Sequence, residues 1–254
     1  MALVQIKVEN QLLVPFGGPK WSIEGIRVVG VSTSGTYIES DTPLAYIDRS
    51  QEVGLRLRNF VEVMPGLWPE DADTRSALAM MHKHLADNCE VSTPDERRFL
   101  ELYFDFVRER VTPSSFVSRN LDRAEWGAPY ADDRWAFAAL MPLPQAHIYA
   151  LNPLEEPASF VPSRMMKVDF AFWTGKQIVA VEIDGGSHIG SESHITKDRL
   201  LQRSGVHVVH ILNSELKSFG MKVIRSLLPA EITRFWTGPD AKQAWNPFDR
   251  SIPF

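Results

Sequence analysis

Residues 167–184 read KVDFAFWTGKQIVAVEID, and this stretch decides the fold. Apolar runs at residues 167–173 and 178–184 flank a short turn that contains Gly175, a pattern typical of a β-hairpin. Glycine favours such turns because it adopts a positive φ without steric cost. The stretch therefore predicts two antiparallel strands joined by a two-residue loop, Gly175-Lys176.

The residues around the hairpin predict a mixed α/β unit. A helix is expected over about 192–203, because Gly205 stands just beyond its end, as glycine commonly does. A further strand over 206–212 should run parallel to the strand at 178–184, since a strand–helix–strand unit crosses over in a right-handed sense. Together with a strand at 145–151, the pattern predicts an α/β fold with a mixed central sheet flanked by helices.

The first half of the chain is expected to be β-rich and then helical. An apolar run at 25–31 and a period-two alternation at 53–63 predict strands. A helix is expected over about 71–86. The segment Ser92-Thr93-Pro94-Asp95-Glu96 is typical of a helix start and predicts a second helix to about residue 110. These patterns divide the chain into a β-rich accessory module at 1–90, an α/β core at 91–236 and an irregular tail at 237–254.

The composition excludes several classes of protein. The single cysteine, Cys89, rules out a disulfide framework and a cysteine-rich zinc site, and it suits a cytoplasmic location. His207 and His210, three apart on a predicted strand, face opposite sides and cannot form a simple metal pair. No run approaches the roughly 18 apolar residues of a membrane span. The net charge of −5 argues against nonspecific coating of nucleic acid, although residues 164–234 are rich in Lys and Arg.

Three carboxylates are expected on one face of the hairpin. Counting outward from the loop places Asp169 opposite Glu182 with Cβ atoms about 5 Å apart, and Asp184 points to the same side. Like charges at this distance are destabilising, and a divalent cation removes the repulsion. Mg²⁺ is commonly held by one or two carboxylates, lowers the pKa of a bound water and offsets charge on a phosphate. The alternative is a solvated polar face at the end of the sheet.

Further polar residues follow the hairpin at the carboxyl end of a strand, where open α/β sheets bind ligands. His188, after a pair of glycines, is either a site residue or an ordinary loop histidine. Lys197 on the predicted helix either reaches the acids or faces solvent. Arg199 and Arg203, one helical turn apart, either contact phosphates of a substrate or solvate a helix face.

These motifs resemble the core of the PD-(D/E)XK nuclease superfamily, over roughly residues 93–228. The likeness is closest to the branch of very-short-patch-repair-like endonucleases and uncharacterised bacterial relatives. It implies a restriction-endonuclease-like core that hydrolyses phosphodiester bonds of DNA with Mg²⁺ or Mn²⁺, in restriction, phage defence or repair. The matching motifs are Val168-Asp169-Phe170, Val181-Glu182-Ile183-Asp184-Gly185 with His188, and Lys197-Asp198-Arg199 ahead of Gly205.

The resemblance also implies roles for individual residues. Asp169 and Glu182 would hold the metal, together with the backbone carbonyl of Ile183. Glu96 matches an acid that the family often carries on its first core helix. An acid in the first turn is also favoured by the helix dipole alone, so a purely local role for Glu96 stays open.

The chain departs from the family signature at one position. The signature places a lysine two residues after Glu182, where this chain has Asp184, as relatives of this branch also do. Lys197 is the candidate for the missing positive charge. Without a replacement, the domain would bind nucleic acid or a partner protein without cutting it. A further alternative is that residues 1–90 are the functional part and recruit a protein partner.

Overall fold

The computed structural model describes part of the chain. His188 and the predicted tail from residue 237 lie outside it. The described residues are 2–6, 11–15, 26–32, 35–40, 44–48, 54–60, 74–89, 93–111, 136–149, 165–185 and 192–233.

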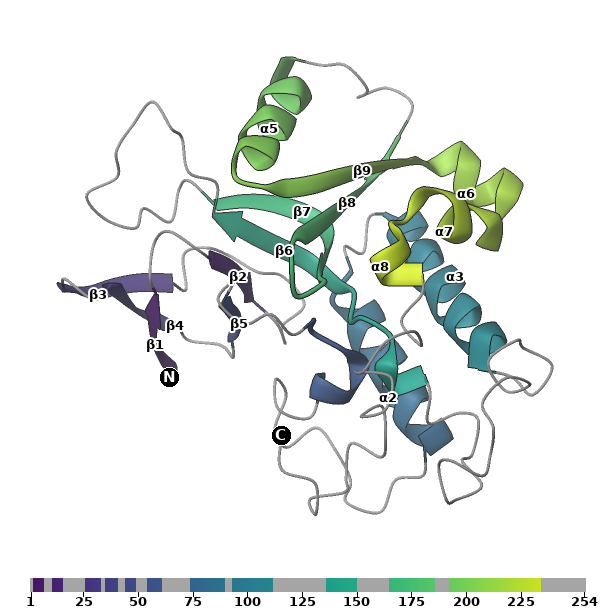
Figure 1. Ribbon diagram of the computed structural model, residues 1–254, viewed down its shortest axis with the longest axis horizontal. Coiled ribbons are helices and arrows are strands. Elements are labelled where there is room, and N and C mark those ends of the chain that lie inside the picture. The colour runs from purple at the N-terminus through teal and green to yellow at the C-terminus, as the bar shows by residue number, and fades with distance from the viewer. Residues whose placement is uncertain are drawn as a thin grey trace.

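A mixed sheet with the strand order β5-β2-β6-β7-β8-β9 forms the centre of the fold (Figure 1). Strands β7 and β8 are an antiparallel hairpin, whereas β8 and β9 are parallel. The predicted hairpin, the predicted parallel pair and the α/β class are thus confirmed. The six strands are β5 (Leu44–Asp48), β2 (Gln11–Pro15), β6 (Leu143–Tyr149), β7 (Met165–Trp173), β8 (Ile178–Asp184) and β9 (Val206–Leu212).

The other N-terminal strands form a separate three-stranded antiparallel sheet in the order β1-β4-β3. They are β1 (Ala2–Ile6), β4 (Gly35–Ser40) and β3 (Ile26–Ser32). The strands agree with the β-rich content expected of this part of the sequence. A distinct accessory module over residues 1–90 stays a prediction, as does the restriction-endonuclease-like identity of the core.

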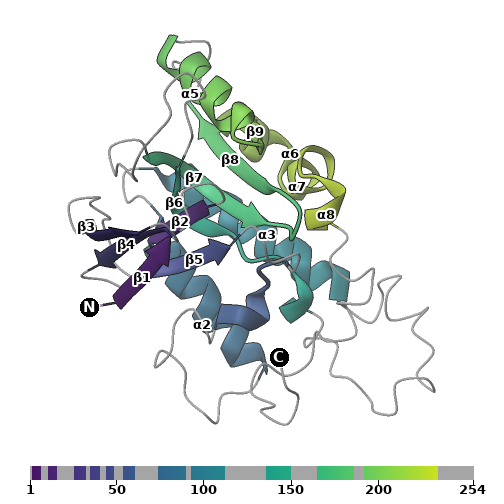
Figure 2. The same ribbon diagram turned by 60° about the vertical axis from the view of Figure 1, so that its left-hand side comes forward.

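Helices cover the sheet on both sides (Figures 1 and 2). Helix α5 (Glu192–Arg203) lies along β9, and α2 (Thr74–Asp87) packs on α3 (Pro94–Val111) on the other side. Three short helices follow β9: α6 (Asn213–Phe219), α7 (Met221–Leu227) and α8 (Ala230–Thr233). Within the described ranges, no helix combines the length and the apolar character that crossing a membrane requires.

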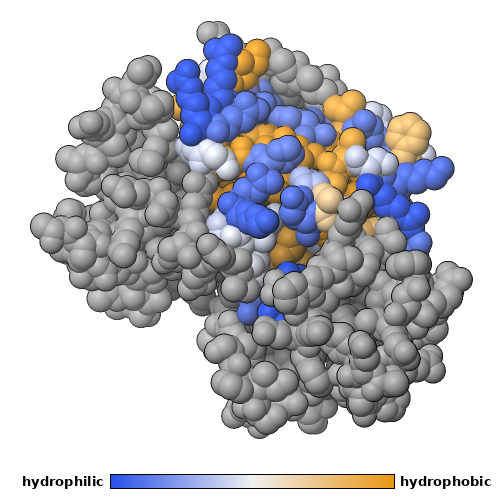
Figure 3. All heavy atoms as spheres, in the orientation of Figure 1, coloured by the Kyte–Doolittle hydropathy of each residue, from blue (hydrophilic) through white to orange (hydrophobic). Residues whose placement is uncertain are grey.

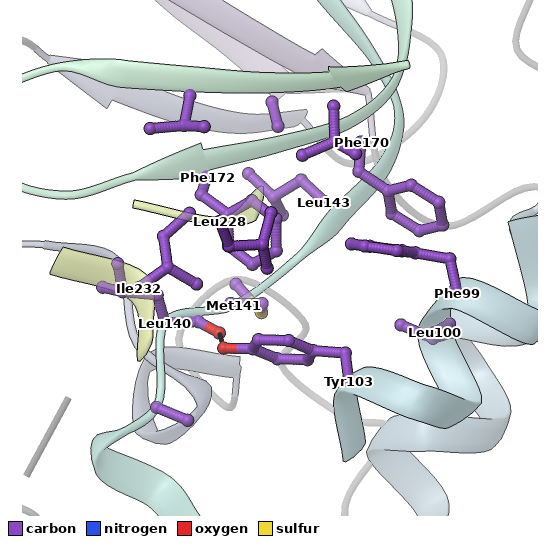
Figure 4. Close-up of a cluster of buried hydrophobic side chains, with 14 of the residues drawn as sticks. Phe99, Leu100, Tyr103, Leu140, Met141, Leu143, Phe170, Phe172, Leu228 and Ile232 are labelled. Carbon is purple, nitrogen blue, oxygen red and sulfur yellow. Dashed lines mark hydrogen bonds between the residues drawn. The ribbon is translucent and has the colours of Figure 1, made fainter. Parts of the chain in front are cut away.

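The core lies between α3 and the sheet (Figure 4). The rings of Phe99 and Phe170 stand 4.8 Å apart, and those of Tyr103 and Phe172 stand 5.4 Å apart. Alternate residues of a strand point to opposite faces, so the two phenylalanines of β7 facing α3 leave Asp169 on the other face of the strand. The packing of α3 therefore fixes which face of β7 carries the acid.

The segment 54–60 corrects one prediction. Its alternation predicted a strand, but it forms a single bridge at Arg56 and the 3₁₀ helix η2 (Leu57–Asn59). The reason is that the consecutive residues Arg56, Leu57 and Arg58 are all buried, so the alternation does not describe a half-exposed strand. The backbone N–H of Leu55 donates to Trp173 O at 3.0 Å, and Arg56 Nη1 donates to Ala138 O at 2.5 Å.

This close approach predicts a stability effect at Gly54. An added Cβ would stand 2.9 Å from Leu140 Cδ2 and 3.1 Å from the carbonyl of Thr174. Gly54→Ala is therefore expected to lower the free energy of unfolding by about 1–3 kcal/mol in urea titrations. At Gly185 the same Cβ meets nothing nearer than Asn213 Nδ2 at 3.9 Å, so Gly185→Ala should change stability by less than about 0.5 kcal/mol. Equal effects at the two positions would contradict the prediction.

Candidate active site

The hairpin of β7 and β8 has the predicted register. Gly175 opens its loop with a φ of 89°, and the N–H of Gln177 donates to Thr174 Oγ1 at 3.1 Å. The backbone ladder ends at the pair Phe170↔Val181, which is one step before Asp169 and Glu182. Beyond the ladder, Asp169 Oδ2 accepts a hydrogen bond of 2.7 Å from the N–H of Ile183. The carboxylate of Asp169 thus binds β8 where backbone pairing has stopped.

Helix α5 delivers Lys197 to Glu182. The Lys197 Nζ atom lies 2.6 Å from Glu182 Oε1, and the glutamate is only 6% exposed. Leu201, one turn further along α5, is fully buried, and this anchors the helix face that carries Lys197. Of the two alternatives for Lys197, the structure therefore has the one in which the ammonium reaches the acids.

The positions of Glu182 and Asp169 disfavour the ionised form of both carboxyl groups. Burial raises the pKa of Glu182 to about 7. The negative charges of Asp169 and Asp184 add to this rise, and the positive charge of Lys197 only partly opposes it. Burial also raises the pKa of Asp169, against the hydrogen bond from Ile183 and the charge of Lys197. Ionised at the same time, these carboxylates repel one another in a poorly solvated place, and a bound cation relieves that repulsion.

A histidine that sequence reasoning missed joins Asp184 to α5. Its ring nitrogens both face carboxylates, since His210 Nδ1 lies 2.6 Å from Asp184 Oδ2 and Nε2 lies 2.9 Å from Asp198 Oδ2. Burial lowers the pKa of His210, but the hydrogen bonds and charges of Asp184 and Asp198 outweigh burial and raise it overall. With an acceptor at each nitrogen, the doubly protonated ring is favoured.

The position of His210 could have been found from the sequence. The predicted strands 178–184 and 206–212 have equal lengths, and aligning them in parallel sets Glu182 beside His210. The ladder has this pairing.

An open cavity of about 370 Å³ adjoins this bridge. It lies between α5 and the carboxyl ends of β8 and β9, the region in which the sequence predicted ligand binding. Its lining combines carboxylates, imidazoles and two apolar side chains: Asp184, His194, Ile195, Asp198, His210, Leu212 and Glu215.

Glu96 lies in the first turn of α3 and is 2% exposed. Thr93 Oγ1 donates to its Oε1 at 2.5 Å, and Gln145 Nε2 donates to its Oε2 at 2.8 Å. Glu96 is therefore not an exposed dipole-complementing acid, although its catalytic role stays a prediction. No feature of the sequence marked Gln145. The predicted phosphate-binding residues Arg199 and Arg203 are exposed on α5.

A metal site is the part of the prediction that the described residues support least directly. No group of three or more His, Cys, Asp or Glu side chains in these ranges is arranged to hold a metal ion. The predicted ligand set is smaller, with two carboxylates and the carbonyl of Ile183, and Mg²⁺ commonly uses one or two carboxylates and keeps several waters. The raised pKa values of Asp169 and Glu182 fit a site completed by a cation.

Comparison with protein-family models, with curated proteins and with solved structures finds no match.

Proposed function

We propose that this protein is a divalent-metal-dependent nuclease that hydrolyses phosphodiester bonds of DNA. The observation that carries the proposal is the contact of the buried Glu182 with Lys197, beside Asp169, at the carboxyl end of β8. A buried acid with a pKa near neutrality, in contact with a lysine and next to a second, half-buried acid, is typical of catalytic rather than structural sites. The choice of DNA rests on the resemblance to PD-(D/E)XK nucleases.

In this proposal each side chain has a distinct task. Asp169 and Glu182, with the carbonyl of Ile183, would hold Mg²⁺ or Mn²⁺, which when bound supplies charge that activates water and offsets charge on the phosphate. The hydrogen bond from Ile183 fixes Asp169 on β8. Lys197 lowers the pKa of Glu182 against the effect of burial and would supply the positive charge that the signature lysine provides in the family.

The outer face of α5 supports binding of a polyanion. Arg199 and Arg203 are exposed there, and hydrophilic side chains gather over this helix in Figure 3. Arg199 lies two residues from Lys197, so the two side chains project from different sides of α5 and the arginines would contact phosphates outside the Glu182 site. Such contacts would help to hold the proposed substrate on the protein without requiring a basic protein overall.

The test is cleavage of plasmid and linear DNA by the purified protein in Mg²⁺, Mn²⁺, Ca²⁺ or EDTA. Cleavage is expected in Mg²⁺ or Mn²⁺ and none in EDTA, because the carboxylates alone do not activate water. A single-stranded RNA substrate of matched length tests the choice of nucleic acid. A folded protein that binds DNA but cuts in no metal would replace the nuclease with a binding module.

A further inference from the structure

The backbone of Gln145 is unusual for a residue within a strand. Its φ of 54° lies in the left-handed region that favours glycine, and no other non-glycine in the described ranges has a positive φ. Such a conformation is costly for a residue with a side chain and persists where its surroundings fix it. In the middle of β6, it indicates that surrounding contacts fix the conformation of Gln145.

Gln145 stands across from the acid of β7. In the β6–β7 ladder, the residues before and after Gln145 are paired with β7, but Gln145 itself is not. The register set by these neighbours places Gln145 opposite Asp169. The flanking pairs are Pro144↔Phe170 and Ala146↔Val168. The strand is therefore distorted at the position opposite Asp169.

The distortion turns the amide of Gln145 to Glu96. Gln145 Nε2 donates to Glu96 Oε2 at 2.8 Å, and the hydroxyl of Thr93 donates to the other carboxylate oxygen. Both Gln145 and Glu96 are buried, with 8% and 2% of their surface exposed, respectively. Glu96 and Asp169 also act on one thiol: burial raises the pKa of Cys89 to about 12, and both carboxylates add to that rise. The two acids thus lie within electrostatic reach of the same group.

We propose that Gln145, the residue of β6 opposite Asp169, is a positioning residue whose amide fixes the Glu96 carboxylate next to the candidate active site. This inference rests on the proposed nuclease function and deepens it. It gives the site a third carboxylate, from α3, whose placement depends on one hydrogen bond. Glu96 then acts on water or cation in the site, and Gln145 acts only through Glu96.

Gln145→Gly tests the proposal because glycine accepts the backbone conformation while removing the amide. The melting temperature is expected to stay within about 4 °C of wild type, since relief of strain offsets the lost hydrogen bond. The kcat for Mn²⁺-dependent DNA cleavage should fall about 10–100-fold, with KM for DNA unchanged. The matched control is Ala146→Gly in the same strand, which should lower the melting temperature and leave kcat unchanged.

A double-mutant cycle with Glu96→Gln decides whether the two residues act together. In the Glu96→Gln background, Gln145→Gly should cause no further fall in kcat. Wild-type kcat in Gln145→Gly, or an equal fall in both backgrounds, overturns this inference alone, provided that the wild type cleaves. A wild type that neither binds Mn²⁺ in calorimetry nor cleaves DNA overturns the proposed function and this inference with it.

Discussion

Replacing Glu182 by glutamine is expected to abolish metal-dependent DNA cleavage and, above pH 7, to stabilise the protein. The pKa of Glu182 is raised by burial from 4.5 to about 7, so the folded state favours the protonated acid. Between these values the folded state holds more protons than the unfolded chain, and stability is lost as the pH rises through this window. Full ionisation costs on the order of 3 kcal/mol, which glutamine does not incur.

Urea unfolding in EDTA measures this effect directly. At about pH 8, Glu182→Gln should be about 1–3 kcal/mol more stable than wild type, and near pH 4 the difference should vanish. The gain is below the full cost because the substitution also leaves Lys197 without its carboxylate. Mg²⁺ should then stabilise the wild type but not the variant, since only the wild type keeps both metal-binding acids.

The control for Glu182→Gln is Glu101→Gln, an exposed carboxylate on α3 that pairs with Arg98. It should alter stability by less than about 0.5 kcal/mol and leave cleavage unchanged. A Glu182→Gln protein that is less stable than wild type above pH 7 would show that the buried carboxylate is structural. Retained cleavage would remove Glu182 from the site.

The elements that hold this site could be predicted from the sequence because their signals are local. The strand 178–184, the helix 192–203 and the strand 206–212 have the expected bounds. Apolar runs define the strands, and glycines with positive φ mark the boundaries at Gly175 and Gly205. Since a two-residue loop sets the register of a hairpin, the pairing of Phe170 with Val181 also followed from counting, and Asp169 and Glu182 lie one step beyond that pair.

The supporting contacts could not be predicted in the same way, because they depend on how distant segments pack. Gln145 contacts Glu96, which lies 49 positions away in the sequence, and its positive φ accompanies this contact. His210 contacts both Asp184 and Asp198 because α5, which carries Asp198, packs against β9. The wrong prediction of a strand over residues 54–60 has the same origin, because Arg56 is buried through a hydrogen bond to Ala138, a residue distant in the sequence.

Replacing Lys197 by methionine is expected to lower kcat about 10²–10³-fold at neutral pH. Methionine keeps a long unbranched stem but removes the ammonium that lies 2.6 Å from Glu182 Oε1. Burial and the charges of Asp169 and Asp184 then raise the pKa of Glu182 without opposition from Lys197. A larger fraction of Glu182 is protonated, so Mn²⁺ binds more weakly and the pH–rate profile moves to higher pH.

The pH dependence of the Lys197→Met enzyme separates two roles of the lysine. If Lys197 only keeps Glu182 ionised, kcat should return to the wild-type level by about pH 9, where the acid ionises without help. A deficit that persists at that pH assigns a second role, in which the ammonium contacts the phosphate or the attacking water. Lys197→Arg should then recover part of kcat, because it keeps the charge with a different geometry. Lys176→Met, on the exposed hairpin loop, is the matched control, and a kcat that is equally unaffected in both methionine variants would exclude Lys197 from the mechanism.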